Sequence, residues 1–135
     1  MFHIRPACDH DIPGIKKVGR RNKKFLGPIM DVYLKNSLSK SELHVACAGR
    51  HIVGFIRWHF RRDGWATIYQ LCVSERVRRQ GLGKRLIAVA GTGPVQLKCR
   101  YGNPALHFYR SLGFRSVGRE VTPGGVKLRI LKRNI

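Results

Sequence analysis

The chain has 135 residues and a formal net charge of +20, from 27 Lys and Arg against 7 Asp and Glu. This length suits one domain spanning residues 1–135, which can bury a core without disulfide or metal staples. No apolar run approaches the roughly 18 residues that a membrane span needs, and no signal-peptide core opens the sequence, so we expect a cytoplasmic protein with no membrane contact.

The first third of the sequence predicts one strand and two helices. Residues 2–7 have strand character. Residues 8–38 have helical tendency, interrupted by glycines, and Pro13 suits the first turn of the first helix. A second short helix is predicted over residues 29–36.

The middle of the sequence predicts an antiparallel meander. Three runs are rich in β-branched and aromatic residues. Two turn signals, Gly49-Arg50 and Asp63-Gly64, separate them. The three predicted strands cover residues 43–49, 51–60 and 66–73.

The last third predicts two helices and three strands. Glycines and Pro94 end the first helix, and Asn103 and Pro104 suit the start of the second. The helices cover residues 82–91 and 103–113, and the strands cover residues 95–101, 114–121 and 126–133.

The stretch RVRRQGLGKRL, residues 76–86, joins a predicted strand to a predicted helix through a glycine-rich turn. Such a turn offers unpaired main-chain N–H groups, and Gly81 and Gly83 let an anion approach the backbone. A Walker loop is excluded because Arg follows Lys84, and a dinucleotide fingerprint is excluded because residue 86 is Leu. The turn carries four cations: Arg78, Arg79, Lys84 and Arg85.

Two blocks resemble the GNAT superfamily of N-acetyltransferases. Arg78-x-x-Gly81-x-Gly83 follows Leu71-x-Val73, as in the acetyl-CoA loop of that family. The stretch NPALHFYRSLGF, residues 103–114, is similar to a helix of the family, and the matching residues are Asn103, Ala105, Phe108, Tyr109, Gly113 and Phe114. The resemblance implies an α/β (α+β) fold: a mixed, mostly antiparallel twisted sheet with a splayed central strand pair, flanked by about four helices.

The resemblance also implies a site for acetyl-CoA as acetyl donor. Pantetheine would lie along the main chain of Leu71 and Val73. The N–H of Val73 would polarise the thioester carbonyl. The backbone amides from Arg79 to Lys84 would hold the pyrophosphate. Tyr109 would protonate the leaving thiolate. The implied cofactor-binding residues are Leu71, Cys72, Val73, Arg78, Arg79, Gln80, Gly81, Leu82, Gly83, Lys84, Asn103 and Phe108.

The general base is not evident. Gln70 occupies the strand position where many family members place a Glu. His59 is the candidate base because its ordinary pKa is near 6.5. A water chain to solvent is the alternative, and it suits an acceptor amine of low pKa.

The high positive charge indicates an acceptor amine carried on an anion. An aminoacyl-tRNA, a modified nucleic acid and an acidic protein N-terminus fit. The candidate polyanion surface comprises KKVGRRNKK (residues 16–24), RWHFRR (residues 57–62) and the tail KLRILKR (residues 127–133), with Trp58 and Trp65 as possible stacking groups.

Two other functions stay open: a nucleic-acid-binding module on a GNAT scaffold, and an acetyltransferase for a small-molecule amine. Direct attack in a ternary complex is the expected mechanism, with Cys72 or Cys99 as an acetyl-carrying nucleophile the alternative. We predict no metal site. The chain is expected to be a monomer or a homodimer.

Overall fold

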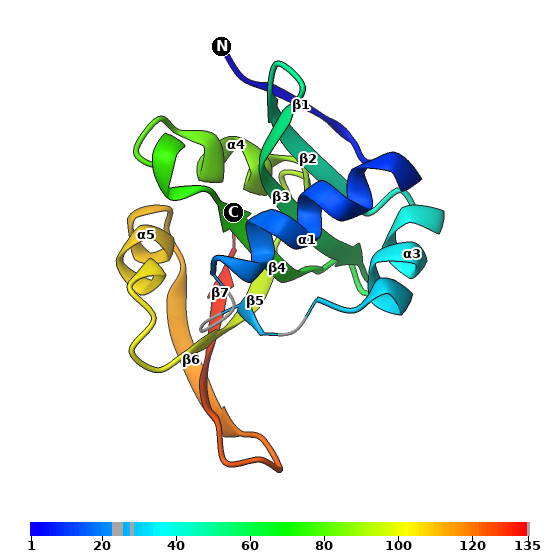
Figure 1. Cartoon of the computed structure of the whole chain (residues 1–135). Helices are drawn as coiled ribbons and strands as arrows, with labels where there is room; N and C mark the ends of the chain where they lie inside the picture. Colours follow the sequence, from blue (N-terminus) through cyan, green and yellow to red (C-terminus); the bar gives the residue numbers. More distant parts are fainter. Residues whose placement is uncertain (23–25, 28, 135) are drawn as a thin grey trace.

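The computed structural model describes residues 1–22, 26–27 and 29–134. Seven strands form one sheet in the order β1-β2-β3-β4-β5-β7-β6 (Figure 1). In chain order the elements are β1 (His3–Pro6), η1 (Asp9–Asp11), α1 (Ile12–Arg20), α3 (Asp31–Ser39), β2 (Leu43–Ala48), β3 (His51–Phe60), β4 (Ala66–Val73), η2 (Glu75–Val77), α4 (Leu82–Ala88), β5 (Val95–Arg100), α5 (Ala105–Ser111), β6 (Arg115–Val121) and β7 (Lys127–Arg133).

All neighbouring strands are antiparallel except β4 and β5, which are parallel. β4 and β5 pair only from Ala66 opposite Val95 to Ile68 opposite Leu97. Beyond Ile68 the two strands separate, and Tyr69 forms a bulge in the pairing of β4 with β3. The predicted mixed sheet with a splayed central pair is therefore confirmed.

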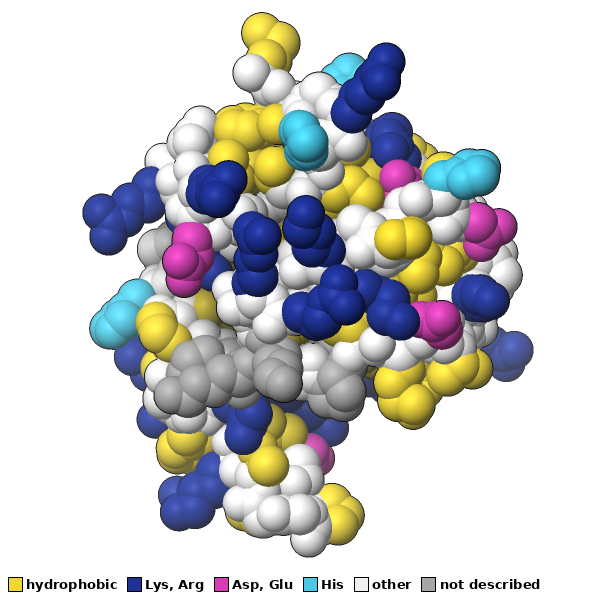
Figure 2. Space-filling model, in the orientation of Figure 1, with side chains coloured by type: hydrophobic (Ala, Val, Ile, Leu, Met, Phe, Trp, Pro, Cys, Tyr) yellow, Lys and Arg dark blue, Asp and Glu magenta, His cyan; other side chains and the backbone are white. Residues whose placement is uncertain are grey.

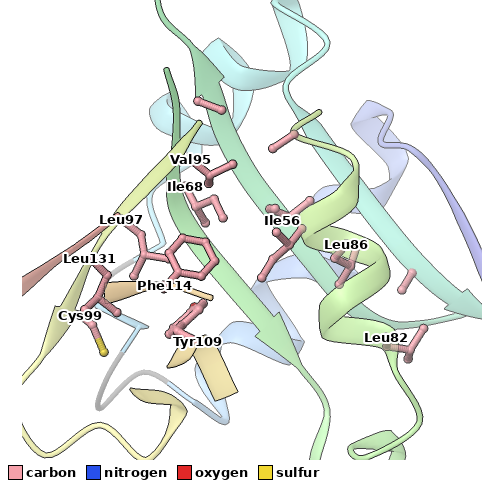
Figure 3. Close-up of a cluster of buried hydrophobic side chains, with 14 residues drawn as sticks. Ile56, Ile68, Leu82, Leu86, Val95, Leu97, Cys99, Tyr109, Phe114 and Leu131 are labelled. Carbon is pink, nitrogen blue, oxygen red and sulfur yellow. The ribbon is translucent and has the colours of Figure 1, made fainter. Parts of the chain in front are cut away.

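The helices cover the sheet on both faces. α4 and α5 pack on one face, where Ile56, Leu86 and Leu97 belong to the larger core cluster (Figure 3). α1 and α3 pack on the other face over β2 to β4, around Ile15 and Phe55. Hydrophobic burial on both faces drives the folding of this layered arrangement.

Most predicted elements are present. α1 has Pro13 in its first turn, as predicted. The second helix was predicted over residues 29–36, whereas α3 spans Asp31–Ser39. β7 lies between β5 and β6, an order that local patterns do not specify. No described helix is long and apolar enough to cross a membrane.

An ion pair fastens β1 to the start of α1. Arg5 Nη1 and Nη2 donate to the two carboxylate oxygens of Asp11 at 2.7 and 2.8 Å, and Cys8 N–H donates to the same carboxylate at 2.8 Å. The hydrogen bond from Arg5 lowers the pKa of Asp11 to about 2. The bidentate geometry is that of the stronger ion pairs.

Candidate active site

The loop between β4 and α4 has the geometry of an anion site. Arg79 and Gly81 have left-handed backbones, with φ of 66° and 80°. Within the described part of the chain, the main-chain N–H groups from Arg79 to Lys84 meet no hydrogen-bond acceptor, and the helix begins with Arg85 N–H donating to Gly81 O. A Cβ on Gly81 would meet nothing within 4 Å. Successive unpaired amides of this kind bind phosphate oxygens.

Gly83 also has a packing role that the sequence did not predict. A Cβ at this position would lie 2.8 Å from Phe108 Cζ, so only Gly admits the Phe108 ring. The sequence suggested that Gly83 opens the backbone to pyrophosphate and that Phe108 packs on pantetheine. In the structure the two residues pack on each other and join α4 to α5.

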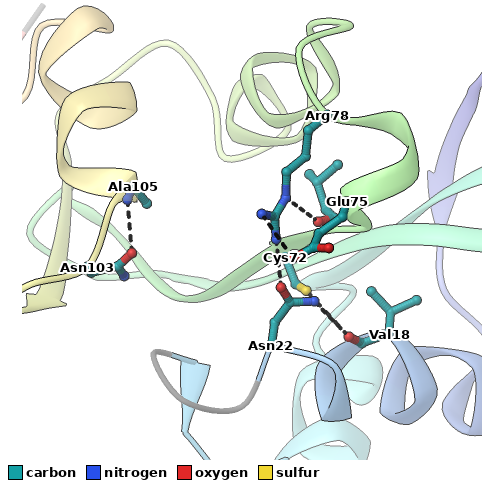
Figure 4. A network of polar contacts seen from close by, with 8 residues as sticks. Val18, Asn22, Cys72, Glu75, Arg78, Asn103 and Ala105 are labelled. Atoms are coloured by element: carbon teal, nitrogen blue, oxygen red, sulfur yellow. Dashed lines mark hydrogen bonds and ion pairs between the residues drawn. The ribbon is translucent and has the colours of Figure 1, made fainter.

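Arg78 does not extend into the loop. Its Nε donates to Val73 O at 3.0 Å and its Nη2 donates to Asn22 Oδ1 at 2.6 Å (Figure 4). Asn22 Nδ2 in turn donates to Val18 O at 3.0 Å. Arg78 thus holds the loop against the ends of β4 and α1.

The free edge of β4 faces the gap between β4 and β5. Ser74 N–H donates to Val53 O on the β3 side. Because main-chain groups alternate along an antiparallel strand, the N–H and C=O of Val73 and Leu71 point toward β5 instead. Cys72, between them, directs its main-chain groups to β3. The gap therefore presents the two residues that the sequence predicted for pantetheine.

Tyr109 comes from α5 and packs between the splayed strands (Figure 3). Its ring lies 5.4 Å from the Phe108 ring and 5.6 Å from the Phe114 ring, the latter edge-on. Tyr109 is 7% exposed. Burial, with Cys99 and Cys72 adding smaller effects, raises its pKa above the usual range. The phenol therefore stays protonated at neutral pH and can donate a proton but not accept one.

Asn103 uses its side chain at the start of α5. Its Oδ1 accepts the N–H of Ala105 at 2.9 Å (Figure 4). This bond satisfies one of the free amides of the first turn.

The structure places the candidate base His59 far along β4 from Val73, the residue proposed to meet the thioester carbonyl. His59 Nδ1 lies 2.7 Å from Glu42 Oε1, and Phe60 N–H donates to the other oxygen of Glu42. His59 pairs with Thr67, six residues before Val73 in β4, which is a separation of about 20 Å. Sequence reasoning missed Glu42 because it precedes β2, far from the motifs.

Gln70 lies closer to the gap and is buried. Its Oε1 accepts Arg57 Nε at 3.0 Å and its Nε2 donates to Leu26 O at 3.5 Å. An amide so engaged is not a base.

The buried cysteines do not favour a covalent acetyl intermediate. Burial raises the pKa of Cys72 to about 11 and raises that of Cys99. A thiol that stays protonated is a poor nucleophile. These pKa directions favour direct attack by the acceptor amine.

Comparison with known proteins identifies the family. The sequence profile of the acetyltransferase (GNAT) domain matches residues 39–116, more than half of the chain. The chain belongs to the GNAT acetyltransferase family, whose enzymes use acetyl-CoA as acetyl donor, as the two motifs indicated. A search of curated proteins gives no significant match.

Solved structures confirm the fold. Ard1 from Thermoplasma volcanium is 21% identical, with a TM-score of 0.83 over 99% of this chain and 97% of its own. The ribosomal-protein-S18-alanine N-acetyltransferase from Escherichia coli is 20% identical, with a TM-score of 0.79 over 100% and 94%. N-acetylglutamate synthase from Neisseria gonorrhoeae, complexed with coenzyme A and N-acetyl-glutamate, is 22% identical, with a TM-score of 0.81 over 99% of this chain. The chain spans only 35% of that synthase.

Proposed function

We propose that this chain transfers an acetyl group from acetyl-CoA to a primary amine carried on an anionic macromolecule. A nucleic acid, as an aminoacyl-tRNA or a modified base, is the foremost candidate, and an acidic protein is the alternative. The observation that carries the proposal is a basic sheet face on the side of the sheet opposite α4.

We call this surface the acceptor face. It is the face of β5, β7 and β6 that points away from α5 and the larger core cluster. The described helices on that side, α1 and α3, pack over β2 to β4 instead. Strand alternation and the pairing register assign these side chains to it: Gln96, Lys98, Arg100, Arg115, Gly118, Glu120, Leu128, Ile130 and Lys132.

Charge on the acceptor face is mainly positive. Four of its residues are Lys or Arg, and its one carboxylate, Glu120, pairs with Lys98 at 2.9 Å. Figure 2 shows further Lys and Arg side chains outside this face, gathered over the middle of the molecule where Figure 1 places α1, with few Asp and Glu side chains among them. Of the predicted basic stretch over residues 16–24, Lys23 and Lys24 lie outside the described residues. A surface of this sign attracts a polyanion.

The two tryptophans differ in their surroundings. Trp65 is half-buried and lies 4.8 Å from Lys132 Nζ, at the border of the acceptor face. Trp58 packs against the core cluster on the opposite face, with its Nε1 enclosed and its ring 6.3 Å from His44. Trp65, and not Trp58, is the aromatic group that a base can reach.

The residues present fit acetyl-CoA, which supplies the acetyl thioester when bound. The unpaired amides of residues 79–84 would hold the diphosphate, and the free edge of β4 at Leu71 and Val73 would hold the pantetheine arm. Val73 N–H would donate to the thioester oxygen as negative charge develops there. Within the described chain the amides of residues 79–84 have no hydrogen-bond acceptor, whereas Val73 O already accepts Arg78 Nε at 3.0 Å.

The proton balance depends on Tyr109 and solvent. As the amine nitrogen bonds to the carbonyl carbon and the C–S bond breaks, Tyr109 gives its proton to the leaving sulfur and is reprotonated from solvent. The amine loses its proton to water. An α-amine next to an ester, as in an aminoacyl-tRNA, has a lowered pKa and needs no stronger base.

Salt dependence tests the acceptor class. Candidates are charged tRNA, DNA with an aminated base, and an acidic peptide, each incubated with labelled acetyl-CoA and analysed by mass spectrometry. For four ion contacts, kcat/KM for a nucleic-acid acceptor should fall about 100-fold between 50 and 200 mM salt. The Kd of acetyl-CoA should change far less.

Lys132→Gln should lower kcat/KM for the macromolecular acceptor. Arg50→Gln, in the exposed turn between β2 and β3, is the matched control and should not. Equal salt sensitivity of acceptor and acetyl-CoA, or undiminished turnover of small neutral amines in the presence of RNA, would contradict the proposal.

A further inference from the structure

We infer that Arg57 binds an oxyanion of the acceptor that lies a few bonds from the reacting amine. This inference rests on the proposed function and refines it: the site would read a local phosphate or carboxylate in addition to the overall charge. The observation behind it is the packing of Arg57 between Tyr33 and Tyr69, three residues that belong to no sequence motif.

Arg57 is a half-buried cation between two tyrosines. Its guanidinium carbon lies 4.7 Å from the centre of the Tyr69 ring and 5.5 Å from that of the Tyr33 ring. Its Nε donates to Gln70 Oε1 at 3.0 Å. Burial lowers the pKa of Arg57, and the two tyrosine hydroxyls oppose that change.

No carboxylate among the described residues forms an ion pair with Arg57. A cation withdrawn from water is normally paired, because desolvation without a partner is costly. Its Nη atoms therefore remain as donors for an anion supplied from outside the chain. The neighbouring rings fix the plane of the guanidinium and reduce the entropy lost when it binds.

The position of Arg57 relates it to the acetyl-transfer site. It pairs with Gln70 across β3 and β4, a strand spacing of about 4.8 Å. Leu71, the next residue, begins the free edge proposed for pantetheine. Tyr69 is the first residue beyond the last β4–β5 pair, so it marks the point where the strands separate. Gln70 precedes Val73 by three residues, or about 10 Å along β4, so an anion on Arg57 would lie at roughly that distance along the strand from the reacting carbonyl, on the sheet face opposite α4.

The chemistry of the group favours a planar or tetrahedral oxyanion. A guanidinium donates two parallel hydrogen bonds to a carboxylate or a phosphate. Tyr33 and Tyr69 are 52% and 50% exposed, so each leaves part of a ring face for a base or another flat group to stack on. A nucleotide phosphate with its base satisfies both features, and a carboxylate satisfies only the first.

The test compares small amines that differ only in the anion. Phosphoethanolamine is compared with ethanolamine, and β-alanine with its amide, by thiol release from acetyl-CoA. We expect kcat/KM for the anionic member of a pair to exceed that of its neutral partner by about 10- to 100-fold, the range for a charge-assisted hydrogen bond. The larger ratio identifies phosphate or carboxylate as the preferred anion.

Variants assign the preference. Arg57→Gln should bring both ratios close to one, and Arg57→Lys should restore them only in part, because an ammonium lacks the fork. Arg50→Gln should leave the ratios unchanged. Thermal unfolding and the Kd of coenzyme A verify that the variants are folded. Ratios that survive in Arg57→Gln would overturn the inference.

A binding measurement separates this inference from the proposed function. In an NMR titration with phosphoethanolamine or β-alanine, the Arg57 Nε–H and Gln70 amide signals should shift. Shifts without thiol release from any amine would support the anion site and refute the acetyl transfer. Thiol release with no shift and no dependence on Arg57 would support acetyl transfer and refute the anion site. If neither occurs, both fail.

Discussion

Tyr109→Phe tests the proposed acid while leaving the core intact. The variant removes one oxygen and keeps the ring contacts with Phe108 and Phe114. Tyr109 Oη forms no hydrogen bond among the described residues, so the free energy of unfolding should change by about 1 kcal/mol or less. Loss of a general acid lowers kcat by about 10²- to 10⁴-fold, or roughly 3 to 5 kcal/mol in the activation free energy.

The assay is initial thiol release at saturating acetyl-CoA. KM for acetyl-CoA should stay unchanged, because the proton is needed only in the transition state. Since burial raises the pKa of Tyr109, kcat of the wild type should not decline below about pH 10, the ordinary tyrosine value. Tyr101→Phe is the matched control, because that ring packs under the Arg129 guanidinium instead. A kcat for Tyr109→Phe equal to that of wild type would refute the acid role.

Further substitutions test the loop and the ion pair. Gly81→Ala places Ala at φ of 80°, a strain of roughly 1 kcal/mol or more, and should weaken coenzyme A binding in calorimetry by about 5- to 10-fold. Gly91→Ala is equally strained, with φ of 100°, but should leave the Kd of coenzyme A unchanged. If both variants weakened coenzyme A binding equally, the loop would not be part of the site. Because the pKa of Asp11 falls from 3.8 to about 2 on folding, its stabilisation is present above about pH 4 and is lost as pH falls toward 2. Asp11→Asn should therefore lower the free energy of unfolding at pH 7 by about 2 kcal/mol, measured by urea denaturation. The stability of this variant should not fall further between about pH 4 and pH 2. Asp9→Asn is the control and should behave like wild type.

Local chemistry made much of the fold predictable. Asp63-Gly64 and Gly49-Arg50 marked turns, and Gly49 and Gly64 indeed have positive φ. Gly113 ends α5 in the left-handed conformation that favours Gly there. The meander was predictable because runs of β-branched and aromatic residues, separated by turn residues, are short-range signals. The glycine-rich loop was found for the same reason.

The contacts that complete the site were not predictable because they join distant segments. Gln70 meets Leu26 across 44 residues, and Arg78 meets Asn22 across 56. His59 looked like a free base in its local stretch, but the fold pairs it with Glu42. Arg57 appeared as one cation of a basic run. The register of β3 with β4 and the docking of α3 place Arg57 against two tyrosines, and no carboxylate in the described part of the chain pairs with it.

The central claim is that the gap between β4 and β5, with the loop of residues 79–84, binds the acetyl donor. A crystal structure of the chain with coenzyme A tests it most directly. The diphosphate should accept hydrogen bonds from amides between Arg79 and Lys84, and the pantetheine arm should pair with Leu71 and Val73, ending near Tyr109. Coenzyme A bound elsewhere, or no binding at concentrations well above those used for turnover, would contradict the account.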